Sequence, residues 1–239
     1  MEFLELSRRG LNRQRRLSLG KRFAVGPQLG ADGTTPPTGR QGKTGEATVG
    51  QAHGKYFEAA SRGVLFGAAD QGSGVAPGTA LGTTGLLALY NPVGSGKLLS
   101  VKKVSLGYVS GTLGAGTVFH CGNLPSNSGA IGAVAQPSGG TSLTIYPRYF
   151  GVQQPTAASK SVAEVRTGAT VTTPVILRPF CSLQASLAST AVAPWMAVED
   201  VDGEFVIAPG FCYQLQTVAA AGSTPLVAPG ITWEEVPIL

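Results

Sequence analysis

The sequence predicts an all-β protein, a sandwich or barrel of antiparallel strands preceded by an extended N-terminal arm. From about residue 56 onward, short apolar or alternating runs recur between turns rich in Gly, Pro, Asn and Ser, a pattern typical of such folds. Gly accounts for 34 of the 239 residues, about twice the usual frequency. Charged residues make up only 13%, about half the usual share.

Residues 1–55 are expected to form the arm, and residues 56–239 the body. Residues 1–22 hold seven basic and two acidic residues, a net charge of +5, while the other 217 residues hold eleven of each sign. Residues 23–55 are dominated by Gly, Thr and Pro, and their apolar residues are too few to bury a core. The excess positive charge therefore lies in the arm. The candidate partner-binding residues are its basic ones: Arg8, Arg9, Arg13, Arg15, Arg16, Lys21 and Arg22.

The body is expected to contain eight to eleven strands after one short helix. The helix covers residues 57–62, with Gly63 as its C-terminal cap. The candidate strands are residues 64–69, 86–90, 98–109, 117–121, 142–149, 161–166, 175–187, 196–198, 204–207, 211–218 and 231–236. Among the connections, residues 200–203 predict a hairpin because they read Asp-Val-Asp-Gly. Pro209-Gly210 predicts a sharp turn before an aromatic strand.

The residues that most enzymes and metal sites require are scarce. There are two histidines, His53 in the arm and His120 in a predicted strand, so a metal site built from several His side chains is not expected. Adjacent strand residues point to opposite faces, which argues against Cys121 and His120 as a nucleophile and base. Residues 94–97 resemble a phosphate-binding loop only faintly, because Lys97 is followed by leucines. The sequence therefore favours a non-enzymatic protein without a cofactor or metal.

Cysteine usage and hydropathy bear on where the chain works. Cys121, Cys181 and Cys212 are odd in number and far apart, so we expect buried, reduced thiols and a reducing cytoplasm at the time of folding. The sequence contains no apolar run of 18 residues, so we expect no transmembrane helix, and we expect no signal peptide. A body with little charge and many small residues suits close packing against other copies of the chain.

Two short segments carry a family resemblance. His53, Lys55, Tyr56, Glu58, Ala59, Arg62 and Gly63 fit the pattern H-(G/A)-(R/K)-Y-x-E-A-x-x-R-G, and Asn91, Pro92, Gly94, Ser95, Gly96 and Lys97 fit NP-x-G-S-G-K. With the C-terminal GITWEEVPIL, these segments resemble a group of virion structural proteins of tailed bacteriophages. The resemblance covers about residues 42–239. It implies a jelly-roll-like β-sandwich located in the virion.

The resemblance implies a structural subunit that self-associates through its sandwich, with a homotrimer favoured. The arm is expected to attach it to the major capsid protein or another virion protein, as head decoration, head fibre or tail-associated subunit, with no membrane partner. One alternative is a capsid shell protein whose residues 1–22 bind nucleic acid, a less favoured partner. The other is an adhesin that binds host glycans through exposed aromatic residues, for which Tyr146, Tyr149, Phe150 and Trp195 are candidates.

Overall fold

A computed structural model describes residues 54–123, 132–150, 160–183, 196–219 and 222–238. The chain divides into units of residues 1–58 and 59–239. The predicted helix is confirmed as α2, Phe57–Ser61. It ends at Gly63, whose φ of 70° is the left-handed conformation that suits glycine at a helix C-terminus. The amide of Gly63 donates to the carbonyl of Ala60 at 2.9 Å.

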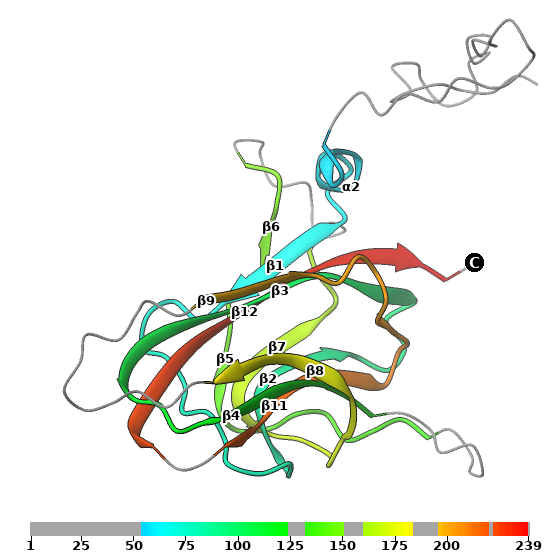
Figure 1. The fold of residues 1–239 in the computed structure, drawn as a ribbon. Helices are drawn as coiled ribbons and strands as arrows, with labels where there is room; N and C mark the ends of the chain where they lie inside the picture. Colours follow the sequence, from blue (N-terminus) through cyan, green and yellow to red (C-terminus); the bar gives the residue numbers. More distant parts are fainter. Residues whose placement is uncertain (1–53, 124–131, 151–159, 184–195, 220–221, 239) are drawn as a thin grey trace, which may run out of the picture. The chain divides into compact units, whose positions relative to one another are not determined.

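The described strands form two antiparallel sheets that pack face to face, which confirms the all-β sandwich (Figure 1). Sheet 1 runs in the order β6, β1, β12, β3 and then β9 and β10 together along the far edge of β3. Sheet 2 has the order β5, β7, β2, β11, β4, β8. The strands of sheet 1 are β1 Leu65–Ala69, β3 Lys97–Thr112, β6 Tyr146–Pro147, β9 Met196–Asp200, β10 Val206–Ile207 and β12 Ser223–Pro237. Those of sheet 2 are β2 Thr84–Asn91, β4 Gly116–Gly122, β5 Thr141–Ser142, β7 Glu164–Thr170, β8 Val175–Leu183 and β11 Phe211–Ala219.

The strand order is that of a jelly roll. Sheet 1 contains the consecutive neighbours β1, β12, β3 and β9, and sheet 2 contains β2, β11, β4 and β8. The chain therefore alternates between the sheets from β1 to β4 and returns beside its own earlier strands, as two Greek keys do. The segment from β5 to β7 is an addition to this order. Its strands pair at the edges, β5 with β7 and β6 with β1.

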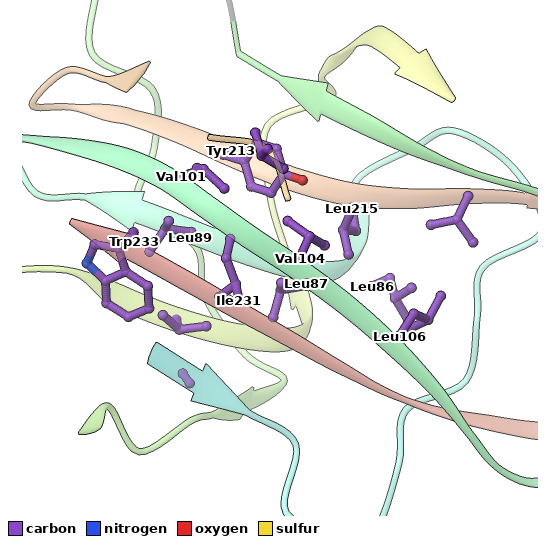
Figure 2. Packing of buried hydrophobic residues seen from close by; sticks show 14 of the residues in the cluster. Leu86, Leu87, Leu89, Val101, Val104, Leu106, Tyr213, Leu215, Ile231 and Trp233 are labelled. Atoms are coloured by element: carbon purple, nitrogen blue, oxygen red, sulfur yellow. The ribbon is translucent and has the colours of Figure 1, made fainter. Parts of the chain in front are cut away.

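The core lies between the sheets and follows the two-residue period of the strands, apart from one register shift between Val101 and Lys103 of β3 where it pairs with β12. Along β3, Leu99, Val101, Val104 and Leu106 are buried, and the residues between them are mostly half-buried. Figure 2 shows side chains of β3 and β12, including Val104 and Ile231, meeting those of β2 and β11, including Leu87 and Leu215. Trp233 is fully buried at one end of this core and stacks on Phe66, with ring centroids 6.3 Å apart.

Sheet 2 is also buried on its outer face. Ala88, Tyr90, Ala169, Val171 and Cys212 form a second apolar cluster there. Beside it, the amide of Gln216 donates to Gln214 Oε1 at 2.9 Å, and the amide of Gln214 donates to Asn123 Oδ1 at 2.9 Å. This ladder lets Gln214 and Gln216 be buried in β11, because each side-chain amide finds a partner.

Two tight turns carry the chain from one sheet to the other, and Asn91 joins them. Its side-chain amide donates to the carbonyls of Lys97 at 2.8 Å and Ile207 at 2.9 Å, while its own carbonyl accepts from Gly210 at 2.7 Å. Gly210 has a φ of 84°, and Phe211 donates to the carbonyl of Ala208 at 3.2 Å. The predicted Pro209-Gly210 turn is therefore confirmed, with the glycine in the position that needs a positive φ.

Three sequence predictions differ from the structure. Residues 200–203 do not form a hairpin, because β9 and β10 run in the same direction along β3 instead of pairing with each other. Asp202 (φ 57°) and Gly203 (φ 88°) instead lie in a short loop, residues 201–203, which we call the excursion. It separates β9 from β10, which otherwise continue as one strand along β3. The predicted strand 142–149 is two strands of two residues in different sheets. Strand β12 begins at Ser223, eight residues before the predicted start.

Candidate functional site: the bridged edge of the sandwich

The predicted partner-binding residues Arg8, Arg9, Arg13, Arg15, Arg16, Lys21 and Arg22 lie outside the described residues. The same holds for His53 and Trp195. The boundary proposed at residue 56 stays a prediction for the same reason. The candidate sites described below therefore lie on the body.

One side of the sandwich is formed by β8 at the edge of sheet 2 and by β9 and β10 at the edge of sheet 1. Four aliphatic side chains of these strands are exposed: Val175 (49%), Ile176 (44%), Val198 (51%) and Val206 (55%). Edge strands offer backbone groups and side chains to a further chain. We call this side the bridged edge, because polar side chains connect its two sheets.

The conformation of β8 places an arginine at the bridge. Its register against β4 shifts between Val118 and Phe119 and again between His120 and Cys121. These irregularities leave Arg178 opposite His120 and Pro179 opposite Phe119. Pro179 is tolerated because an edge strand need not donate every backbone hydrogen bond. Bulges re-aim side chains, and here Arg178 reaches from sheet 2 to sheet 1.

Arg178 binds two carboxylates of the opposite sheet. Its Nη2 donates to Glu199 of β9, and its Nε donates to Glu204 at 3.1 Å, with a second bond from Nη2 to Glu204 at 2.8 Å. The guanidinium also lies over the ring of Phe205, 5.3 Å from its centroid. Because Glu199 and Glu204 flank the excursion at residues 201–203, Arg178 holds this whole segment against sheet 2.

His120 forms the buried half of the bridge. Its side chain is fully buried, and its Nε2 lies 3.1 Å from Glu199 Oε2. Its Nδ1 lies 2.5 Å from the hydroxyl of Tyr213 on β11. The rings of Phe180, Phe205 and Tyr213 surround it at centroid distances of 5.2 to 5.9 Å. A carboxylate only accepts hydrogen bonds, so Nε2 carries the proton and Nδ1 accepts from Tyr213 in the neutral ring.

The environment shifts the pKa of each member of this network. Burial lowers the pKa of His120, and the hydrogen bond from its ring to Glu199 offsets only part of that effect. Burial acts to raise the pKa of Glu199, but hydrogen bonds from Arg178 and His120 outweigh it, so the net pKa is lowered. Burial raises the pKa of Tyr213 well above its usual value. The favoured state is therefore neutral His120 and Tyr213 beside an ionised Glu199.

A tyrosine, a histidine and a carboxylate in series are also the parts of a nucleophile, a base and an orienting group. The hydroxyl of Tyr213 belongs to a side chain that is 2% exposed and packed within the core. The arrangement is therefore a structural connection between the sheets.

Burial disfavours ionisation of the three thiols in this fold. Cys121 and Cys212 are buried as predicted, whereas Cys181 on the edge strand β8 is only half-buried. Burial raises the pKa of each thiol to about 12, so the nucleophilic thiolate is scarce at neutral pH. Cys121 Sγ donates to the carbonyl of Phe119 at 3.7 Å, away from the hydrogen-bonding nitrogens of its neighbour His120.

The faint phosphate-loop resemblance has a structural explanation. Residues 92–96 connect β2 with β3, and Lys97 Nζ lies 2.8 Å from Glu235 Oε2. The carboxylate of Glu235 is fully buried and also accepts from Ser161 Oγ at 2.6 Å and from the amide of Val162 at 3.0 Å. Lys97 therefore neutralises a buried charge. Among the described residues, no group of three or more His, Cys, Asp or Glu side chains is arranged to hold a metal ion.

A second surface holds the aromatic residues that the sequence singled out. Tyr146 (47% exposed), Tyr149 (45%) and Phe150 (79%) lie at and after β6. Between them, the guanidinium of Arg148 lies against Gly67, where an added Cβ atom would collide with it. Its Nη2 donates to Thr232 Oγ1 at 3.4 Å.

Sequence reasoning located His120 but not its partners. Glu199 and Tyr213 are 79 and 93 residues away along the chain. No local pattern connects such positions, because the jelly-roll order alone brings β4, β9 and β11 together. In the described part of the chain, no helix is long and apolar enough to cross a membrane. No family model matches this sequence, and no curated protein is significantly similar to it.

Proposed function

We propose that this protein is a structural subunit of a tailed-bacteriophage virion, which self-associates through its β-sandwich and attaches to the particle through its N-terminal arm. The resemblance of residues 53–63 and 91–97 to such proteins suggests the virion. The observation that carries the self-association is the bridged edge, where Val175, Ile176, Val198 and Val206 are exposed on unpaired strand edges. We take this edge as the contact between copies.

The other edges of the sandwich are less suited to pairing. At the opposite ends of the sheets, β5 and β6 contain two residues each, which is too short for an extended ladder. Strand β8 contains nine residues. Long edges with apolar side chains promote association. Pro179 and the two register shifts interrupt β8 in its middle, so Val175 and Ile176 at its start form the apolar part of this edge. A closed cyclic assembly, with a homotrimer preferred, would cover the bridged edge of every copy.

The arm complements this body in charge. Residues 1–55 carry ten basic and four acidic residues, a net charge of +6, whereas residues 56–239 carry eight basic and nine acidic. An arm of 55 residues can span about 180 Å when extended. The basic residues of the arm thus have the length and the charge to bind acidic groups of neighbouring subunits.

Charge substitutions at the edge test the proposal. Val175→Lys and Ile176→Lys place an ammonium group on the outer edge of β8, where desolvation on assembly is costly. Their native mass spectra and sedimentation profiles are expected to shift from the oligomer to the monomer. The control is Val93→Lys, because Val93 is 68% exposed in the turn between β2 and β3. An edge variant that keeps the wild-type stoichiometry would exclude this edge as the contact, and a monomeric wild-type protein would exclude self-association.

The exposed aromatic residues favour a second candidate function, the binding of host glycans. Sugar rings stack on exposed aromatic faces, and Tyr146, Tyr149 and Phe150 provide three of them beside Arg148. A glycan array distinguishes this function from a purely structural one. Binding that is lost in Tyr146→Ala and Phe150→Ala, but kept in Val93→Lys, would support an adhesin.

A further inference from the structure

The bridged edge depends on one titratable side chain that has no contact with solvent. His120 is fully buried and engages both ring nitrogens, one toward Glu199 of sheet 1 and the other toward Tyr213 of sheet 2. The backbone ladder holds β9 to β3 within sheet 1. At this edge, the side chains of His120 and Arg178 attach β9 to sheet 2 through their contacts with Glu199.

The geometry accommodates the neutral ring better than the charged one. In the imidazolium form Nδ1 becomes a donor, so the hydroxyl of Tyr213 has to turn its own proton away from the ring. That hydroxyl is buried among apolar side chains, and an unsatisfied buried donor is costly. The new positive charge on the ring would also be repelled by the nearby guanidinium of Arg178, which already binds Glu199.

The charged and titratable groups around His120 come from every element packed against it. Tyr213 belongs to β11, Arg178 and Cys181 to β8, and Glu199 to β9, while Glu204 follows the excursion after β9. Cys121 is its neighbour on β4, and the remaining walls are the rings of Phe180 and Phe205. Glu199 and Glu204 favour the imidazolium, whereas burial and Arg178 oppose it, and burial is the largest of these effects.

We propose that His120 is an acid-sensitive latch: its protonation opens the bridged edge and loosens β8 from β9 and residues 201–205. At neutral pH the latch is closed and the edge is a rigid surface. Under mild acid the two sheets separate locally along this side while the rest of the sandwich stays folded. The latch is a property of the folded chain and does not depend on the proposed virion function.

The direction of the pH effect follows from the lowered pKa of His120. The unfolded or open state takes up a proton near the ordinary value of 6.5, and the closed state resists it. Stability of the closed edge is therefore complete above that pH and is lost as the pH falls toward the pKa of the closed state. Glu199 also has a lowered pKa, so it adds a loss of the same sign only below its ordinary value of 4.5. Opening that begins between these two values is due to His120.

Hydrogen exchange of the full-length protein, followed by mass spectrometry from about pH 7.5 to about pH 5, tests the latch. After correction for the intrinsic pH dependence of exchange, peptides of β8 and of residues 196–207 are expected to exchange at least about tenfold faster at the lower pH, because the open state binds the proton that the closed state resists. Peptides of β1 and β12 serve as the internal reference. Unchanged protection of the edge across this range would refute the latch.

Two variants and a control assign the effect to His120. His120→Gln keeps a neutral side chain that donates and accepts, so its edge is expected to show no such change with pH. Glu199→Gln removes the shared carboxylate and is expected to exchange rapidly even at neutral pH. Asp200→Asn is the control, because Asp200 pairs with the exposed Lys103 at 3.0 Å and has no part in the latch. A pH response that persists in His120→Gln would overturn the assignment.

A spectroscopic measurement that leaves His120 in place keeps the test decisive even if His120→Gln does not fold. The chain has two histidines, so His53→Gln leaves a single imidazole signal in the NMR spectrum. Its titration is expected to follow the opening of the edge with the same midpoint. Opening without titration of His120, or titration without opening, would contradict the latch.

Discussion

At the scale of single residues, several polar side chains are buried within the strands of the sandwich. His120, Gln214 and Glu235 are each at most 1% exposed, and each has identified hydrogen-bond partners. Burying a polar group is costly unless it is paired, and these pairs join segments that are distant in the sequence. Such residues specify which strands meet, whereas the apolar core supplies most of the free energy of folding.

Leu215 shows the contribution of a single core side chain. It is fully buried on β11 in the main core cluster. Leu215→Ala removes apolar contacts and leaves a cavity, so we expect the free energy of unfolding to fall by about 2–5 kcal/mol. Denaturant unfolding measures this loss. Val218→Ala is the matched control on the same strand, because Val218 is 40% exposed, and a loss equal to that of Leu215→Ala would contradict the assigned core.

At the scale of elements, the turns decide how the strands are distributed between the sheets. The turn at residues 92–96 and the turn at Pro209-Gly210 each carry the chain from one sheet to the other. Asn91 connects the two turns through its side chain and its carbonyl. By contrast, residues 200–203 keep the chain in one sheet, although their composition resembles that of a hairpin. Turn composition indicates that the chain bends, but the partners of the flanking strands decide where it goes.

Gly210→Ala tests the crossing between β10 and β11. A Cβ atom at this position would lie 2.7 Å from Ala133 Cβ, at a φ of 84° that L-residues rarely adopt. We expect a loss of about 1–3 kcal/mol in the free energy of unfolding. Gly94→Ala shares a positive φ of 76° but meets no atom within 4 Å. A smaller loss in that control isolates the collision, and equal losses would mean that the backbone conformation alone is responsible.

At the scale of the whole molecule, the body and the arm are expected to act separately. The described core is formed entirely by residues between Leu65 and Trp233. The sandwich thus has the apolar clusters of a self-sufficient domain. The arm carries the excess positive charge, whereas the body is close to neutral. We therefore expect the arm to serve attachment and the body to fold without it.

Removal of residues 1–55 tests this division. Residues 56–239 alone are expected to give the circular dichroism spectrum of a β protein and a melting temperature close to that of the full chain, because the described core is intact. Attachment to the particle is expected to be lost. Replacing Arg8, Arg9, Arg13, Arg15 and Arg16 together with Ser should weaken attachment, as should added salt, because exposed charges are screened. An unfolded or aggregated body would show that the arm belongs to the sandwich.

The sequence by itself determined the class of the fold and the position of most strands. Alternation and turn residues are local signals, so β1, β2, β3, β4, β8 and β11 were predicted close to their observed bounds. The same signals failed at residues 142–149, where two short strands pair in different sheets. They also missed the first part of β12, where Pro and Gly residues are paired with β3 across irregularities of register.

Only the tertiary structure decided which residues form the bridged edge. His120, Arg178, Glu199 and Tyr213 come from four strands that are adjacent because the jelly roll places them so. The bulges that aim Arg178 at β9 depend on the pairing of β8 with β4. Local propensity acts over a few residues, whereas pairing, burial and the resulting pKa shifts depend on contacts between residues far apart in the sequence, such as His120 and Tyr213 at 93 positions. For that reason the sequence identified His120 as a strand residue, and the fold alone made it a connection between two sheets.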